Sequence, residues 1–273
     1  MGGEVRSVTS SLYEPLQTTG FEHAIVRDIS YGTHERQTLD VHTPSVRPGG
    51  ALPVLCFVHG GGFAGGEKAR AGVPYYDNIG RWAVGSGFIA VNLTYRLAPE
   101  FTYPAGAEDV ARALTWVYSH IAEHGGDPTA VVVMGHSAGA SHVATALTAP
   151  QIVQGLPYLP AGAILSSGIF DPAVEPLAYS VYFSDDPAVL PLRSSVEALC
   201  QLDMPILVST AQFDPPEIQV HTRRLVDAYY DTHGLMVDLV QAEGHNHFSV
   251  MFHIGTDETW LSDRFARFVE RVG

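Results

Sequence analysis

The feature that most constrains the fold is a regular alternation of apolar runs with segments of helical periodicity. The run "LPVLCFVHG" at residues 52–60 is continuously apolar, as expected for a strand that is covered on both faces. In the segment 105–124, Val110, Leu114, Val117 and Ile121 recur at the spacing of a helix face. Such alternation predicts an α/β fold with a mostly parallel eight-stranded sheet flanked by helices.

The predicted elements follow one another along the whole chain. Strands are expected at residues 23–32, 36–44, 52–60, 87–96, 130–136, 161–168, 205–212 and 235–244, with the first two forming an antiparallel pair. Helices are expected at residues 75–85, 105–124, 138–149, 218–233 and 257–272.

A single domain over residues 1–273 is expected, because no repeat, low-complexity segment or linker interrupts this pattern. Residues 171–204 differ from the rest, with four prolines in an irregular stretch and one short helix expected at 194–202. Long irregular segments in compact domains often cover a binding site. We therefore expect residues 1–20 and 171–204 to form cap or lid elements.

Composition limits the molecules that this protein is expected to bind and the compartment in which it is expected to occur. The chain has a formal net charge of −14 and no basic run, so nucleic acid and anionic membrane surfaces are poor partners. Its two cysteines lack metal-ligand spacing and are interpreted as buried thiols. The N-terminal stretch lacks the apolar segment of a signal peptide, and no run reaches transmembrane length. These observations favour a cytoplasmic protein without a bound metal; a homodimer is possible.

Two glycine-containing corners follow predicted strands. In "VVVMGHSAGASHVA" (131–144), Ser137 stands between two glycines where a strand pattern becomes a helix pattern, as for a nucleophile on a tight bend. In "HGGGFAGG" (59–66), a glycine run leaves backbone N–H groups bare for a developing oxyanion. We expect those donors to be Gly61, Gly62 and Ala138. A flexible turn is the alternative for the loop, whereas a phosphate cradle lacks its Lys-Ser/Thr ending.

An acid and a base follow later strands. Asp214 ends the run "ILVSTAQFD", and its carboxylate could orient the imidazole of a catalytic histidine. An Asp before two prolines is also typical of a helix N-cap, which is the alternative. Glu217 is the reserve candidate. In "EGHNHF", His247 is preferred over His245 as the base, and a metal-binding His pair lacks a fitting third ligand. The chain order Ser, Asp, His is that of serine hydrolases with an α/β sheet.

The motifs resemble those of the α/β-hydrolase superfamily, and within it the hormone-sensitive-lipase-like esterases. The resemblance rests on "HGGGF", on "YRLAPEFTYPAGAEDV" (95–110), on Gly135 to Gly139 and on "FDPPE", and it covers residues from about 21 to the end. It implies an α/β-hydrolase fold with a reduced cap, and an esterase that uses Ser137, Asp214 and His247 without a cofactor. "GHSAGA", "HNHF" and "YGTHERQTLDVHTP" are more similar to the feruloyl-esterase and kynurenine-formamidase-like branch. His136 departs from the Asp or Glu usual at its position.

The expected function is hydrolysis of small carboxylic esters with short or aromatic groups through an acyl-enzyme. An arylformamidase-type amidase acting on an N-formylkynurenine-like substrate is the nearest alternative, because both would use the same three residues. A non-catalytic small-molecule binding protein on the same fold is a further alternative. Aromatic residues near strand ends are candidates for the pocket or for the core: Phe63, Tyr103, Phe170, Tyr179, Tyr182, Phe183 and Phe213.

Overall fold

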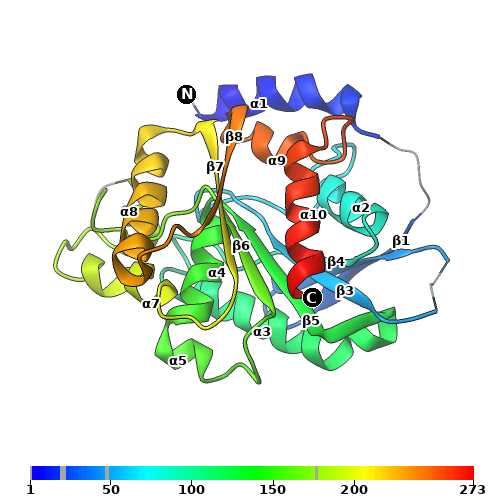
Figure 1. Ribbon diagram of the computed structural model, residues 1–273, viewed down its shortest axis with the longest axis horizontal. Coiled ribbons are helices and arrows are strands. Elements are labelled where there is room, and N and C mark those ends of the chain that lie inside the picture. Colours follow the sequence, from blue (N-terminus) through cyan, green and yellow to red (C-terminus); the bar gives the residue numbers. More distant parts are fainter. Residues whose placement is uncertain (1, 19–22, 47–48, 176–177) are drawn as a thin grey trace.

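The computed structural model describes residues 2–18, 23–46, 49–175 and 178–273 (Figure 1). Eight strands form one sheet in the order β1-β2-β4-β3-β5-β6-β7-β8. The strand β2 is antiparallel to β1 and to β4, and all other neighbours are parallel. This is the mostly parallel eight-stranded sheet predicted from the sequence.

The strands lie close to the predicted positions. Their bounds are β1 (His23–Ser30), β2 (Thr38–Pro44), β3 (Leu52–Val58), β4 (Ile89–Leu93), β5 (Gly126–His136), β6 (Gly162–Ser166), β7 (Ile206–Phe213) and β8 (Asp238–Asn246). The central strands β4 and β6 are buried along their whole length, which explains their continuous apolar character.

Helices cover both faces of the sheet (Figure 1). On one face, the sheet packs against α3 (Ala105–His120), α4 (Ala138–Thr148), α5 (Pro150–Val153), α7 (Val196–Leu199) and α8 (Pro216–His233). On the other face it packs against α2 (Asp77–Gly85), α9 (Ser249–Phe252) and α10 (Trp260–Val272). Successive residues of β3 point to opposite faces of the sheet, so Cys56 packs in the core on the first face and Leu55 in the core on the second.

The irregular segment 171–204 has less helix than expected. The helix expected at 194–202 is only α7, and the rest contains α6 (Ser180–Phe183) and the 3-10 turn η3 (Leu190–Arg193). Residues 176–177, and residues 1, 19 and 20 of the expected N-terminal cap element, lie outside the described residues. The other 3-10 turns are η1 (Glu14–Leu16) and η2 (Ile121–His124).

The N-terminal helix α1 (Gly2–Tyr13) was not expected as a helix. Its sequence, GGEVRSVTSSLY, is rich in residues with low helix propensity. Tertiary contacts fix it instead: the Asn246 side chain donates to the Thr9 hydroxyl at 3.1 Å, and the Tyr75 hydroxyl donates to the Ser10 carbonyl at 3.3 Å. Figure 1 shows α1 lying across the top of the molecule, over β8 and α9.

Candidate active site

Ser137 lies at the corner between β5 and α4, in a backbone conformation that side chains rarely adopt, with φ 55° and ψ −124°. The corner is tight because α4 approaches the end of β3 closely. A Cβ atom on Gly139 would lie 2.1 Å from the Val58 carbonyl oxygen, so only glycine fits there. The serine is thereby held at the carboxyl end of the sheet, where ligands of open α/β sheets bind.

The structure joins the three predicted side chains by hydrogen bonds. The Ser137 hydroxyl and Nε2 of His247 are 2.9 Å apart, and Nδ1 of His247 and Oδ1 of Asp214 are 2.7 Å apart. With Nδ1–H donating to the carboxylate, Nε2 is free to accept the serine proton. His247 follows β8 directly and precedes α9, and Asp214 follows β7.

Asp214 is buried and its carboxylate is saturated with donors. Besides His247, its Oδ2 accepts hydrogen bonds from Ser167 Oγ at 2.7 Å, Thr210 Oγ1 at 3.0 Å and the Ala211 N–H at 2.8 Å. Burial by itself raises the pKa of Asp214, but these hydrogen bonds outweigh it and hold the pKa below its ordinary value. The carboxylate is therefore charged whenever His247 takes up a proton.

The two alternatives for the acid and the base occupy other places. The side chain of Asp214 makes no cap hydrogen bond to α8, whose N-cap residue is Pro215, and Glu217 is exposed. His245 is buried with Nδ1 3.1 Å from the Ser249 hydroxyl and Nε2 3.4 Å from a Glu258 oxygen. It makes no hydrogen bond to Ser137 within the described chain.

The glycine loop lines the same cavity as Ser137 and has N–H groups without an acceptor among the described residues. Gly61 has φ +150°, and a Cβ there would lie 1.9 Å from the Gly65 carbonyl oxygen. The N–H groups of Gly61 and Gly62 donate no hydrogen bond among the described residues. Ala138 is the first residue of α4, so its N–H has no acceptor within the helix. All three predicted donors are thus unpaired.

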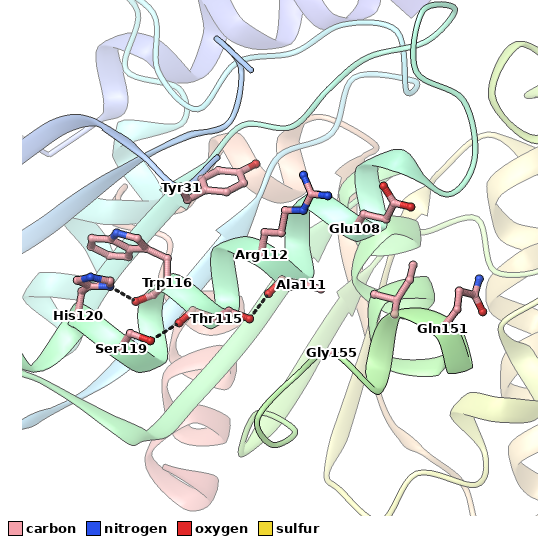
Figure 2. A pocket seen from close by; sticks show the side chains of 11 residues that line it. Tyr31, Glu108, Ala111, Arg112, Thr115, Trp116, Ser119, His120, Gln151 and Gly155 are labelled. Atoms are coloured by element: carbon pink, nitrogen blue, oxygen red, sulfur yellow. Dashed lines mark hydrogen bonds between the residues drawn. The ribbon is translucent and has the colours of Figure 1, made fainter. Parts of the chain in front are cut away.

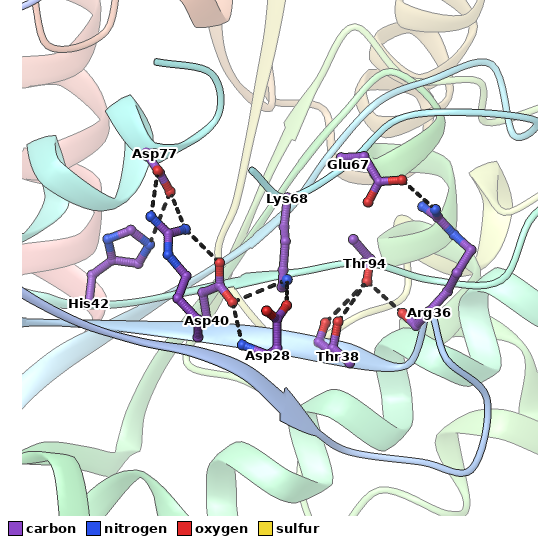
Figure 3. A network of polar contacts seen from close by, with 10 residues as sticks. Asp28, Arg36, Thr38, Asp40, His42, Glu67, Lys68, Asp77 and Thr94 are labelled. Atoms are coloured by element: carbon purple, nitrogen blue, oxygen red, sulfur yellow. Dashed lines mark hydrogen bonds and ion pairs between the residues drawn. The ribbon is translucent and has the colours of Figure 1, made fainter. Parts of the chain in front are cut away.

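Charged side chains hold the loop against the antiparallel edge of the sheet (Figure 3). Arg36 donates to the Gly66 carbonyl and to the Tyr95 carbonyl, each at 2.8 Å, and to Glu67 at 2.6 Å. Lys68 pairs with Asp28 at 2.5 Å and with the fully buried Asp40 at 3.2 Å. The two residues that follow the glycines, Glu67 and Lys68, are therefore both held by ion pairs.

His136 has a role in the geometry that sequence reasoning missed. Its Nε2–H donates to the backbone carbonyl of His247 at 2.9 Å, and the two rings are 4.8 Å apart. Burial, aided by the neighbouring His247, lowers the pKa of His136 to about 3, so the ring is neutral and can donate from only one nitrogen. In the sequence, the only sign of this role was that His136 replaces the Asp or Glu usual at its position. The sequence did not indicate that its partner is the His247 carbonyl.

A cavity of about 410 Å³ opens onto Ser137 and His247. Its wall comprises Gly3, Arg6, Gly60, Gly61, Gly62, Gly65, Gly66, Arg70, Tyr76, His136, Ser137, Tyr179, His247 and Phe248. Of the aromatic candidates, Tyr179 lines this cavity. Phe63, Tyr182 and Phe183 instead form a buried cluster, with the rings of Phe63 and Tyr182 stacked at 4.4 Å. Phe170 is in the core and Phe213 is exposed.

A second groove, of about 530 Å³, lies on α3 and α5 and shares no residue with this cavity (Figure 2). Three of its polar side chains bond backbone carbonyls within α3: Thr115 donates to Ala111, Ser119 donates to Thr115, and His120 donates to Trp116. Among the described residues, no cluster of three or more His, Cys, Asp or Glu side chains is arranged to hold a metal ion. None of the described helices has the length and apolarity needed to cross a membrane.

Comparisons with known proteins agree with this geometry. The BD-FAE family model matches residues 39–154, which include the glycine loop and Ser137. Esterase B from Lactobacillus rhamnosis superimposes with a TM-score of 0.81 at 16% identity, covering 99% of this chain and 92% of that one. The chain has the α/β-hydrolase fold. The predicted fold class is therefore confirmed, since this chain matches an esterase structure over nearly its whole length.

Proteins similar to part of this chain in sequence carry esterase names. Carboxylesterase NlhH of Mycobacterium tuberculosis is 43% identical over 109 residues, which make up 40% of this chain and 33% of that protein. The probable carboxylic ester hydrolase LipM of the same species is 39% identical over 114 residues, or 41% of this chain and 26% of that protein. The matched part thus spans about a third or less of these relatives. The predicted similarity to hormone-sensitive-lipase-like esterases is confirmed; the feruloyl-esterase and kynurenine-formamidase-like branch stays a prediction.

Proposed function

We propose that the protein is a serine hydrolase that cleaves carboxylic esters of small molecules through an acyl-enzyme. The observation that carries this proposal is the hydrogen-bond chain from Ser137 through His247 to Asp214, beside three unpaired N–H groups. The esterase names of the relatives support the same reaction.

The geometry supplies each step of acyl transfer. Nε2 of His247 takes the proton of Ser137 as Oγ bonds to the ester carbonyl carbon, and the carbonyl oxygen becomes an oxyanion that accepts from Gly61, Gly62 and Ala138. The bond to the alcohol oxygen then breaks, and the alcohol leaves with the proton from His247. Water adds to the acyl-enzyme in the same way, releasing a carboxylic acid and restoring Ser137.

We further propose that α1 and the segment 171–204 act as a reduced cap on one domain. Gly3 and Arg6 of α1, and Tyr179 of the segment, line the cavity over Ser137, which supports this role. A cytoplasmic location and a homodimer remain predictions from the sequence. The formamidase alternative uses the same three residues, and no contact in the cavity favours it.

The test is hydrolysis of p-nitrophenyl acetate and butyrate by the purified protein and its Ser137→Ala variant. We expect Ser137→Ala to lose at least about a thousandfold in kcat while remaining folded. Ser119→Ala, which removes an exposed hydroxyl from α3, is the matched control and should retain full activity. Likewise His247→Ala should be inactive and His245→Ala active.

Two further measurements separate the alternatives. A fluorophosphonate probe should label wild-type protein and not Ser137→Ala, whereas absence of labelling would favour a binding protein. Rates on N-formylkynurenine and on a butyrate ester, measured side by side, distinguish amidase from esterase. Hydrolysis retained by purified Ser137→Ala would falsify the assignment of the nucleophile.

A further inference from the structure

Two arginines line the cavity that contains Ser137. Arg6 comes from α1 and is half-buried, and Arg70 comes from the segment between the glycine loop and α2 and is exposed. They belong to elements far apart in the sequence, yet both face the same cavity. The mechanism above uses neither of them.

Neither arginine has an acidic partner among the described residues. Seven other arginines form ion pairs there: Arg27, Arg36, Arg96, Arg223, Arg224, Arg264 and Arg271. Arg81, Arg112, Arg193 and Arg267 also lack an ion pair among the described residues, so it is their shared cavity beside Ser137 that distinguishes Arg6 and Arg70. Guanidinium groups are well suited to bind carboxylates through paired hydrogen bonds.

The described wall of the cavity contains no Asp or Glu side chain. The positive charges of Arg6 and Arg70 act on Tyr76, where burial raises the pKa and the two guanidinium groups oppose it. Tyr179 is in a different surrounding, since burial, Glu217 and Asp214 raise its pKa to about 12. The two guanidinium groups are thus close enough to act on Tyr76, whereas Asp214 and Glu217 act on Tyr179.

A neighbouring cavity of about 380 Å³ shares Gly3, Arg6 and Arg70 with the first. Ser7, Ser10 and Ser11 of α1 also line it, and its described wall again contains no acidic residue. The two arginines thus stand where the cavities meet. This arrangement leaves room for a charged substituent next to the group that reacts with Ser137.

We propose that Arg6 and Arg70 bind a carboxylate of the substrate, so that the preferred substrates are esters that also carry a free carboxylate. This inference rests on the proposed esterase function and names its substrate class. The carboxylate can belong to the acyl part, as in a monoester of a dicarboxylic acid, or to the alcohol part. Local attraction by the two arginines must overcome the repulsion of an anion by a chain of net charge −14.

The test uses two pairs of substrates that differ by one charge. Ethyl hydrogen succinate and ethyl succinamate place it on the acyl side, and 4-acetoxybenzoate and 4-acetoxybenzamide place it on the alcohol side. In at least one pair we expect kcat/KM to be at least about tenfold higher for the carboxylate, as for a charged hydrogen bond. The Arg6→Gln/Arg70→Gln double variant should lose this preference, so that its kcat/KM is about equal for the two members of that pair.

Arg112→Gln is the matched control, because Arg112 lies in the groove on α3 and α5, away from the cavity. It removes the same charge and should leave the preference unchanged. A second readout needs no variant: raising NaCl from about 0.05 to about 0.5 M should reduce the preference of the wild-type protein, since salt screens exposed charges.

Equal rates within both pairs, or a preference that survives in the double variant, would overturn the inference. Hydrolysis of the neutral esters in that case leaves the proposed function standing. If no ester of either pair is hydrolysed, the inference fails; the proposed function fails with it only if p-nitrophenyl acetate and butyrate are not hydrolysed either.

Discussion

At the scale of single residues, the position of His247 depends on His136. The imidazole of His136 holds the backbone carbonyl of His247, at 2.9 Å, just where the chain leaves β8. His136 contacts no reacting atom in the proposed mechanism, so we regard it as a positioning residue. Its removal should affect the alignment of His247 and leave the cavity wall formed by Arg6, Arg70 and Tyr179 in place.

We expect His136→Leu to lower kcat about tenfold or more, because the buried carbonyl loses its donor. His136→Gln keeps an N–H donor of similar reach and should recover part of the loss. Steady-state kinetics of both variants on p-nitrophenyl butyrate provide the measurement. A purely structural role predicts lower thermal stability in both variants with an unchanged kcat, and that result would contradict a positioning role.

At the scale of elements, the conformation of the glycine loop depends on its own glycines and on side chains from β1, β2 and the turn between them. Arg36 reaches the loop from the turn between β1 and β2, where it bonds the Gly66 carbonyl, and Lys68 bonds the carboxylates of Asp28 and Asp40 (Figure 3). We therefore infer that the antiparallel edge of the sheet helps to position the proposed oxyanion donors, Gly61 and Gly62.

Arg36→Met should lower kcat about tenfold, since the loop that carries the Gly61 and Gly62 N–H groups loses its link to the sheet edge. KM should change less, because Arg36 does not line the cavity. Kinetics on p-nitrophenyl butyrate test this prediction, with Arg271→Met as the control. Arg271 lies on α10 and also pairs with a carboxylate, that of Asp238. A loss of equal size in both variants would argue against a specific role of Arg36.

The same elements show what sequence can and cannot predict. Strand ends were predictable, because apolar runs and glycine corners are local signals, and parallel strands bring their carboxyl ends to one edge. The helix α1 was not, because long-range contacts such as Asn246 to Thr9 fix a segment of low helix propensity. The presence of Arg6 in the wall of the cavity that contains Ser137 depends on that helix. The hydrogen bond of His136 likewise joins residues 111 positions apart.

At the scale of the whole molecule, buried histidines link stability to pH. The chain has 13 histidines. Burial lowers the pKa of six of them to about 3 or about 4: His42, His59, His136, His142, His221 and His253. Each of these imidazoles has a buried nitrogen without a hydrogen-bond partner among the described residues, as fits a neutral ring.

The sign of the effect follows from proton uptake. An unfolded histidine binds its proton near pH 6.5, whereas these six remain neutral in the folded protein until about pH 4 to 3. Between those limits the unfolded state holds more protons than the folded state. The contribution of these six histidines to the free energy of unfolding is therefore fully present above about pH 6.5 and is lost as the pH decreases. Each extra proton adds about 1.4 kcal/mol per pH unit to the slope.

We therefore expect acid unfolding near pH 5, because several protons per molecule soon exceed a total stability of about 5–15 kcal/mol. Urea unfolding at a series of pH values between about 7.5 and 5.5 gives the slope, which should correspond to an uptake of several protons. His253→Asn keeps a polar side chain beside the Ser249 carbonyl and should reduce the uptake by about one proton. A slope of one proton or fewer in the wild-type protein would show that these imidazoles are already charged in the folded state, or that the unfolded chain shields them equally.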